Sequence, residues 1–392
     1  MMFLEFAIRG SWSILVARHM ESLGFSGLQI GWVYATFSIG ALLSPLAVGW
    51  LADRHLRADH LFSVCHLLGA VTLFLAWTAS DFSSFFTYIL LHNIVFYPTV
   101  SLANSISFFH LEDRNTYGAV RVWGTYGWIG INLLLSAWLV TTQGHHEGPQ
   151  STSDCLLFGT VLCLIGACGA FWIPATPPPR SRESIWAFAK HLHIFKQRAF
   201  MVLVGTGIGV GICLAFVYNF TFLYFTSPSG YGLDAGPANI ALTLGQGAEI
   251  ACMVGLAAII RRLSLRPVLL MGLAALWLRL LLFSLENIPL PVALAAQALH
   301  GVDYAFFIAA GAIAVDQYIP GHQRAQAQAF ILLVIWGLGM LIGHLLSGWW
   351  YDHTLLSIDG PRHQDWQAFF QLPTWILTPF LVGFALLFPR NR

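Results

Sequence analysis

Charged side chains are scarce in this chain of 392 residues, since Asp, Glu, Lys and Arg together make up 9% of it. Soluble domains carry roughly 25% charged residues, so a wholly water-facing surface is excluded. Hydrophobic residues make up 57%, which fits a surface that faces lipid. The net charge of +1 gives no reason to expect a nucleic-acid partner.

Catalytic motifs are missing as well. The sequence has no Walker loop, no H-E-x-x-H and no G-x-S-x-G. Its six cysteines form no CxxC pair and no metal-ligand spacing. We therefore expect neither an enzyme nor a bound metal or cofactor. No cleavable signal peptide is evident, and we expect the first apolar run to stay as a span.

Long apolar runs, each near the 20 residues that a bilayer requires, recur along the chain. They predict an all-α membrane protein with twelve transmembrane helices. The expected spans are 2–20, 28–51, 60–79, 84–109, 116–140, 154–173, 199–225, 238–260, 267–285, 290–315, 325–349 and 368–388.

The basic residues fix the expected orientation, because cytoplasmic loops are enriched in Lys and Arg. With the N-terminus inside, 14 of the 19 Lys and Arg residues fall in cytoplasmic segments and only Arg362 falls outside. The other four, Arg9, Arg18, Arg121 and Arg279, fall within spans. This predicts a multi-pass protein of the cell (inner) membrane with both termini cytoplasmic.

A proline-bearing, basic segment at 175–198 separates spans six and seven. A proline run cannot continue a helix, and the stretch after it is compatible with an amphipathic helix on the membrane surface. We expect an N-terminal six-helix half at 1–174 and a C-terminal half at 199–392. Two such halves are typical of secondary transporters that bind substrate near the bilayer midplane.

The loop after span two reads GWLADRHLRAD, residues 49–59. It resembles the G-x-L-A-D-R motif of the major facilitator superfamily. The resemblance implies a latch between helices, in which Gly49, Asp53 and Arg54 match the motif and Arg57 adds a cation. The alternative is a plain basic loop.

A narrower resemblance covers most of the chain. Its segments are FLEFAIRGSW (3–12), CHLLGAVTLF (65–74), YPTVSLANSISF (97–108), VRVWGTYGWIG (120–130) and DWQAFF (365–370). Together they resemble the nucleoside:proton symporters of the major facilitator superfamily. The resemblance implies the major facilitator fold and import of nucleosides with protons.

Three residues of span five, Arg121, Thr125 and Trp128, have the spacing of one helical face. They offer a cation, a hydroxyl and an aromatic plate, which suit the ribose and the flat base of a nucleoside. In the resembled family the matching positions help to form the substrate site. The alternative is an arginine that packs the N-terminal half together.

Span eight carries Gln246 and Glu249 at i and i+3, so they share a face. The family has a Gln and a Glu at this spacing in its binding site. We expect Gln246 to bind substrate and Glu249 to bind ribose hydroxyls, the coupling proton or both. The alternative is a structural ion pair of Glu249 with Arg279.

Span ten brings His300, Asp303 and Tyr304 within about one helical turn. His300 and Tyr304 align with aromatic positions of the family, whereas the expected Asp position is Ala305. A shift of two residues rotates a side chain by about 200°. Asp303 is thus a second candidate for proton coupling, or else it pairs with a neighbouring helix.

Span seven departs from the family, which places side-chain amides there. Cys213 and Phe216 stand at the expected amide positions. Asn219 is the nearest amide and Tyr218 is a stacking candidate, so we include both among the substrate-binding candidates. Together with the departure in span ten, this departure motivates an alternative cargo, such as a sugar or glycoside.

Span one carries Glu5 and Arg9 at i and i+4. They predict either an intrahelical ion pair or an added charge in the transport cavity. Among the 15 histidines, His92 and His300 are the two to test in transport.

The leading functional prediction is a monomeric, proton-coupled nucleoside importer that works by alternating access. The alternatives are a proton-coupled importer of a sugar or glycoside, and a membrane receptor that does not transport.

Overall fold

The computed structural model describes residues 1–54, 56–113, 116–143, 152–178, 197–320, 323–356 and 363–389, and the side chains of 44–54, 143 and 325 are not part of this description. Within these ranges the chain forms twelve helical stretches, several of them built from two or three helices in line. Nine described helices are long and apolar enough to cross a membrane. The expected twelve-helix, all-α fold is confirmed. Most of the expected linker at 175–198, with its amphipathic helix, lies outside the described residues.

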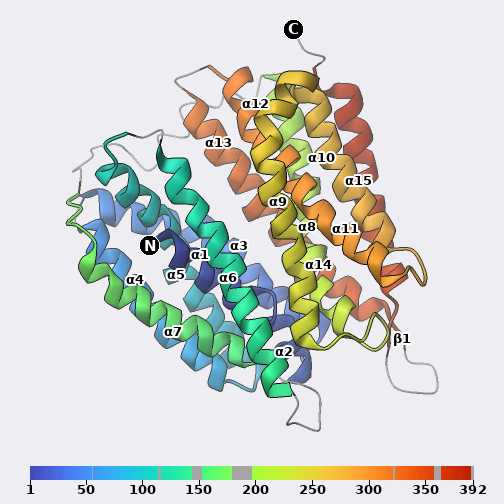
Figure 1. Ribbon diagram of the computed structural model, residues 1–392, viewed down its shortest axis with the longest axis horizontal. Coiled ribbons are helices and arrows are strands. Elements are labelled where there is room, and N and C mark those ends of the chain that lie inside the picture. Colours follow the sequence, from blue (N-terminus) through green and yellow to red (C-terminus); the bar gives the residue numbers. More distant parts are fainter. Residues whose placement is uncertain are drawn as a thin grey trace. The chain divides into compact units, whose positions relative to one another are not determined.

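The chain divides into two compact units. Unit 1 is Met1–Ile185 with Asp234–Ile240, and unit 2 is Trp186–Leu233 with Ala241–Arg392. In unit 1, α1 packs against α6 and α7, and α5 packs against α3 and α4 (Figure 1). Its helices are α1 (Met2–Ser13), α2 (Val16–Ser22), α3 (Gly27–Arg54), α4 (Ala58–Thr78), α5 (Phe82–His110), α6 (Tyr117–Gln143), α7 (Asp154–Gly169) and the 3-10 turn η2 (Ala170–Trp172).

Unit 2 packs α8 against α14 and α15, and α10 against α11 and α15 (Figure 1). The first residues of α9 belong to unit 1 and the rest to unit 2. The elements are α8 (Arg198–Thr226), α9 (Ala235–Leu263), α10 (Leu265–Phe283), α11 (Leu290–Asp303), η4 (Tyr304–Ala309), α12 (Ala310–Tyr318), α13 (Arg324–Leu332), η6 (Leu333–Gly339), α14 (Met340–His353), β1 (Leu355–Leu356), β2 (His363–Gln364) and α15 (Trp366–Leu387). Strands β1 and β2 pair antiparallel, with Leu355 opposite Gln364.

The first expected span is interrupted between α1 and α2. Carbonyl groups at the end of a helix need partners outside it. Here the hydroxyl of Tyr34 on α3 donates to the Ser13 carbonyl at 2.9 Å. The hydroxyl of Thr152, just before α7, donates to the Leu15 carbonyl at 2.7 Å. These two hydroxyls give hydrogen-bond partners to carbonyl groups that the interruption leaves without them inside the apolar unit.

Two spans contain π-helical segments, η4 in the tenth span and η6 in the eleventh. A π-bulge inserts an extra residue per turn and often marks a functional position. Here the bulges carry Tyr304 and Trp336, which both belong to the aromatic cluster described below.

Asp81 caps the N-terminus of α5. Its carboxylate accepts a hydrogen bond from the Ser84 backbone N–H at 2.9 Å, and that bond lowers the pKa of Asp81. An N-cap of this kind satisfies one of the N–H groups that a helix leaves without a partner.

Candidate functional site

A chain of ionisable side chains crosses three helices of unit 2. Glu249 of α9 lies 3.9 Å from Nε2 of His300 on α11, and Nδ1 of His300 lies 3.4 Å from the Asp303 carboxylate. The Glu249 side chain is 19% exposed, whereas those of His300 and Asp303 are 4% exposed. An imidazole can accept a proton on one nitrogen and release one from the other. The chain therefore links an accessible carboxylate to a buried one.

Arg279 of α10 ends this chain. Its guanidinium lies 3.5 Å from the Asp303 carboxylate and donates to the side-chain oxygen of Gln297 at 2.6 Å. Arg279 is 1% exposed, so its charge is balanced inside the unit. The alternative of a Glu249–Arg279 pair is wrong, because Arg279 is bound to Asp303 instead. The expectation that Asp303 pairs with a neighbouring helix is confirmed.

Glycine at 301 lets α9 and α11 approach closely enough to form this chain. A Cβ atom at Gly301 would lie 2.3 Å from the backbone carbon of Ala248 and 2.4 Å from the backbone nitrogen of Glu249. Real Cβ atoms do not approach backbone so closely, so any side chain here pushes α9 away. Gly301 thus permits the close approach of α9 and α11 beside Glu249 and His300.

We therefore expect Gly301→Ala to impair both packing and transport. Overpacking of this kind costs about 1–3 kcal/mol, which lowers the melting temperature in detergent. Gly311→Ala is the matched control, since no atom lies within 4 Å of the added Cβ. Equal melting temperatures for the two variants would contradict the role of Gly301.

Aromatic rings gather beside the ionisable chain. The rings of Tyr218 on α8 and Trp336 on η6 are nearly parallel, at 5°, with centroids 6.3 Å apart. His300 lies edge-on to Tyr218 at 5.9 Å, and Tyr304 lies 6.0 Å from His300 and 6.5 Å from Trp336. We call Tyr218, His300, Tyr304 and Trp336 the aromatic cluster. Such rings can stack on a planar base.

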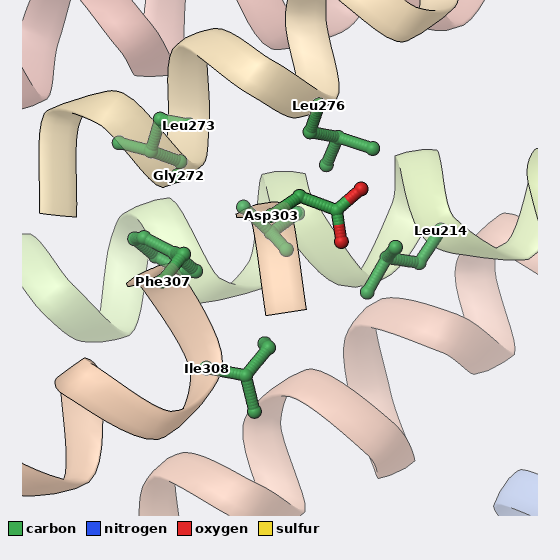
Figure 2. A pocket seen from close by; sticks show the side chains of 8 residues that line it. Leu214, Gly272, Leu273, Leu276, Asp303, Phe307 and Ile308 are labelled. Atoms are coloured by element: carbon green, nitrogen blue, oxygen red, sulfur yellow. The ribbon is translucent and has the colours of Figure 1, made fainter. Parts of the chain in front are cut away.

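Asp303, the buried carboxylate of this series of ionisable side chains, also lines a small apolar pocket. Figure 2 shows the Asp303 carboxylate between Leu214 and Leu276, with Phe307 and Ile308 nearby. The space there is too narrow to hold a water molecule, whereas typical ligand pockets measure about 300–1,000 Å³. It surrounds the buried carboxylate and is not the size of a substrate site.

Gln246 lies one turn before Glu249 on α9, as its spacing predicted. Its side-chain oxygen is buried and has no hydrogen-bond partner among the described residues. A buried, unsatisfied amide oxygen is costly, and a ligand hydroxyl or N–H would satisfy it. Gln246 therefore stays a substrate-binding candidate.

Asn219 does not join the aromatic cluster. It is fully buried, donates to the Ser347 hydroxyl at 3.0 Å and lies 2.9 Å from Nδ1 of His344, both on α14. Its amide is used in helix packing, so we withdraw it as a substrate ligand. The spacing along span seven could not reveal this, because the partners lie on another helix.

Cys213 and Phe216 face away from the ionisable chain. The Cys213 thiol donates to the Pro373 carbonyl of α15 at 3.3 Å, and the Phe216 ring packs on Phe369 of α15. On α8, Val210 and Leu214 line the pocket and Tyr218 belongs to the cluster. The absence of amides at 213 and 216 therefore does not alter the aromatic cluster.

In unit 1, the candidates Arg121, Thr125 and Trp128 lie on α6, all half-buried. The Arg121 guanidinium lies over the ring of Phe6 on α1, 4.0 Å from its centroid, a cation–π contact. The indole N–H of Trp128 is buried without a hydrogen-bond partner among the described residues. A polar ligand on this face would find a cation and an unused donor.

Two glycines of the same segment, Gly124 and Gly127, stand where α6 lies too close to α1 for a side chain. A Cβ at Gly127 would lie 2.0 Å from the Phe3 carbonyl oxygen, and one at Gly124 would lie 2.6 Å from the Phe6 ring. Both glycines let α1 lie directly on α6. This packing places Phe6 beneath the Arg121 guanidinium.

The loop motif is described only in part. The side chains of Gly49, Asp53 and Arg54 lie outside the described residues. Arg57 pairs with Asp59 at 2.6 Å, and the Asp59 carboxylate accepts the Thr176 backbone N–H at 2.9 Å. The start of α4 is thus tied to the segment that follows η2. Sequence reasoning missed Asp59.

Glu5 and Arg9 take separate partners. The Glu5 carboxylate lies 3.1 Å from His66 and accepts a hydrogen bond from Thr99 at 2.8 Å. The Arg9 guanidinium lies over the rings of Phe37 and Tyr97. The predicted intrahelical ion pair is therefore wrong.

The sequence matches the nucleoside H+ symporter family over residues 1–392. This chain belongs to that family. YegT of Escherichia coli is 31% identical over 89% of this chain and 82% of that protein. Xanthosine permease of Escherichia coli is 27% identical, covering 98% of this chain and 92% of the permease.

The fold of this symporter-family member agrees with solved structures. A mutant form of nucleoside transporter NupG matches with a TM-score of 0.88 at 24% identity, over 99% of this chain and 98% of NupG. The D-xylose-proton symporter matches with a TM-score of 0.75 at 12% identity, over 99% of this chain and 97% of that one. The major facilitator fold is thereby confirmed, and the relatives are transporters rather than enzymes.

Trp336 is the residue of the aromatic cluster that sequence reasoning missed. It stands in LLVIWGLGM, an apolar stretch with no ionisable neighbour. From the sequence, a tryptophan in such a stretch is expected to face lipid or to pack in the core. Only the packing of η6 on α8 identifies its partner, Tyr218.

Proposed function

We propose that this chain imports nucleosides together with protons and that Glu249 binds the coupling proton. Membership of the nucleoside H+ symporter family supports the cargo and the ion. The observation that carries the role of Glu249 is its position. It is the accessible end of a chain that continues through His300 to the Asp303–Arg279 pair.

Protonation of Glu249 changes the electrostatics of its neighbours. The ionised carboxylate attracts a protonated His300 ring, and a neutral carboxyl does not. Because Asp303 is held by Arg279, the His300 ring has one fixed partner and one that changes with proton binding. A side chain with two alternative arrangements is the kind of element that couples binding to conformational change.

For the substrate, we assign the base to the aromatic cluster and the ribose to Gln246 and Glu249. Base stacking on aromatic rings contributes about 1–3 kcal/mol per base. In unit 1, Arg121, Thr125 and Trp128 remain substrate-binding candidates. Transporters of this architecture alternate access to the substrate by moving one half against the other.

The sugar alternative is motivated by the altered spans seven and ten. In span ten, Asp303 pairs with Arg279 on a neighbouring helix. Cys213 and Phe216 pack on α15, so their identity does not bear on the cluster. No observation now favours a sugar over a nucleoside. The non-transporting receptor is distinguished by the uptake experiment that follows.

The experiment is uptake of labelled uridine and adenosine into proteoliposomes with an imposed inward pH gradient. We expect accumulation that collapses when an uncoupler dissipates the gradient. Competition by free ribose or xylose, without competition by nucleosides, would favour the sugar alternative. Binding without uptake would favour a receptor.

Substitution of Trp336 tests the aromatic cluster. We expect Trp336→Ala to raise the KM for nucleoside roughly 10- to 100-fold, because a stacked ring contributes about 1–3 kcal/mol. Trp336→Phe keeps a ring and should lose less. Trp375→Ala, on α15 with 71% exposure, is the control for loss of a tryptophan. An unchanged KM in Trp336→Ala would remove Trp336 from the site.

The remaining assignments are also proposals. The 14-to-1 distribution of Lys and Arg supports the inner membrane with both termini cytoplasmic. We also propose that the linker at 175–198 divides the chain into two halves and that the protein is a monomer. Labelling of single cysteines from either side of sealed vesicles would test the orientation.

A further inference from the structure

A carboxylate, an imidazole and a hydroxyl meet inside unit 1, apart from the residues assigned to transport. One oxygen of Glu5 on α1 lies 3.1 Å from Nε2 of His66 on α4. Its other oxygen accepts a hydrogen bond from Thr99 on α5 at 2.8 Å. Glu5 is 1% exposed and His66 is 0% exposed. Three helices thus converge on one buried ionisable pair.

The backbone partner of His66 shows which of its ring nitrogens carries a hydrogen. Nδ1 lies 2.9 Å from the Phe62 carbonyl oxygen. A carbonyl oxygen only accepts, so Nδ1 carries a hydrogen and donates it. Without a second proton, Nε2 presents a lone pair to a carboxylate oxygen that also has none to give. Two acceptors 3.1 Å apart in an apolar interior repel each other.

We propose that Glu5 and His66 together bind one proton, which makes this pair a proton-binding site separate from Glu249. The proton sits either on the carboxyl, which then donates to Nε2, or on Nε2, which then donates to the carboxylate. In both forms the pair is neutral overall. When the proton leaves, a buried carboxylate remains beside a neutral imidazole.

No other described group forms a hydrogen bond with the two atoms that would share the proton. Among the described residues, neither that Glu5 oxygen nor Nε2 of His66 has a hydrogen-bond partner elsewhere. The Phe62 ring lies 4.2 Å from the His66 ring, and Phe96 lies edge-on at 5.8 Å. A Cβ at Gly166 of α7 would lie 2.5 Å from Cδ2 of His66, so the α7 backbone closes the remaining side.

Among the described residues, neither Arg9 nor Arg121 forms an ion pair with Glu5. The Arg9 guanidinium lies over Phe37 and Tyr97, and that of Arg121 lies over Phe6. The Met1 amino group interacts electrostatically with Glu5, and its positive charge opposes retention of the proton. Cys65 of α4, His92 of α5 and Cys163 of α7 are further described groups that interact electrostatically with the pair.

Loss of this proton should weaken the packing of unit 1. Above roughly pH 6.5 a free imidazole is neutral, so in the unfolded chain the imidazole keeps only its one N–H hydrogen and the carboxylate has none. The folded pair keeps one proton beyond that hydrogen, so folded protein binds one proton more than unfolded protein. Stability that depends on such a proton is present at low pH and falls as pH rises.

The variant Glu5→Gln tests this. A glutamine amide donates to Nε2 of His66 and accepts from Thr99 at every pH, so it imitates the protonated carboxyl. Thermal unfolding in detergent, without substrate and without a gradient, is measured between pH 6.5 and 8.5. Relative to Glu5→Gln, the unfolding constant of wild type should rise about tenfold per pH unit. Glu112→Gln, at an exposed position, is the matched control and should follow wild type.

Parallel curves for wild type and Glu5→Gln would overturn the proposal. If Glu5→Gln fails to fold, the second measurement is the infrared spectrum of Glu249→Gln, in which the carboxyl proposed for transport contributes no band. A protonated buried carboxyl or an imidazolium band that persists at pH 8 supports the site, and absence of both bands overturns it. Because neither measurement involves transport, failure here leaves the assignment of Glu249 untouched, and failure of uptake leaves this site untouched.

Discussion

Glu249→Gln is expected to abolish nucleoside accumulation driven by a pH gradient, with initial uptake falling roughly 100-fold. An amide cannot take up and release the proton, and hydrogen bonds to charged groups contribute about 1.5–3 kcal/mol, or one to two powers of ten. Exchange of labelled for unlabelled nucleoside in the absence of a gradient should persist. Glutamine has the shape of the protonated side chain, so the substrate still binds.

The two assays are run on the same proteoliposomes, so that loss of coupling is separated from loss of binding. Glu286→Gln is the matched control, because Glu286 is exposed in the connection between α10 and α11. Gradient-driven accumulation at the wild-type level in Glu249→Gln would remove Glu249 as the proton carrier. Loss of exchange as well would show that binding of the ribose, which the proposal assigns to Gln246 and Glu249, requires the Glu249 carboxylate itself.

The arrangement of helices could be predicted from the sequence because membrane insertion makes strong, local demands. Each span needs about 20 apolar residues, and the basic loops set orientation. The twelve stretches follow from these demands alone. The interruption at Ile14 and Leu15 could not be predicted, since the stabilising hydroxyls of Tyr34 and Thr152 come from distant segments.

Residue types in the site were predictable, but their pairings were not. Glu249, His300 and Arg279 are conspicuous because ionisable residues are rare in spans. Helical spacing reports neighbours on one helix, so it suggested a Glu5–Arg9 pair that the structure does not contain. The partners of Glu5, Arg279 and Asn219 all lie on other helices. Side-chain pairing across helices is set by packing, for which close approaches such as Gly301 are decisive.

The buried pair of Arg279 and Asp303 predicts the largest effect on stability. We expect Asp303→Asn to destabilise the protein by about 3–5 kcal/mol, because it leaves the Arg279 charge buried without a counter-charge. Thermal unfolding in detergent measures this as a lowered melting temperature. Asp316→Asn is the control, since Asp316 pairs with Arg324 at 3.2 Å but is exposed. Exposed pairs contribute about 0–1 kcal/mol.

The double variant Arg279→Met with Asp303→Leu separates charge balance from proton transfer. Replacement of a buried ion pair by apolar residues is often neutral or stabilising, and Leu214, Leu276 and Phe307 already surround position 303. The melting temperature should therefore recover. Gradient-driven uptake should stay about tenfold low, because His300 has lost the carboxylate beside Nδ1. Full recovery of coupled uptake would restrict Asp303 to a structural role, whereas a melting temperature as low as that of Asp303→Asn would show that the ion pair is not what stabilises these helices.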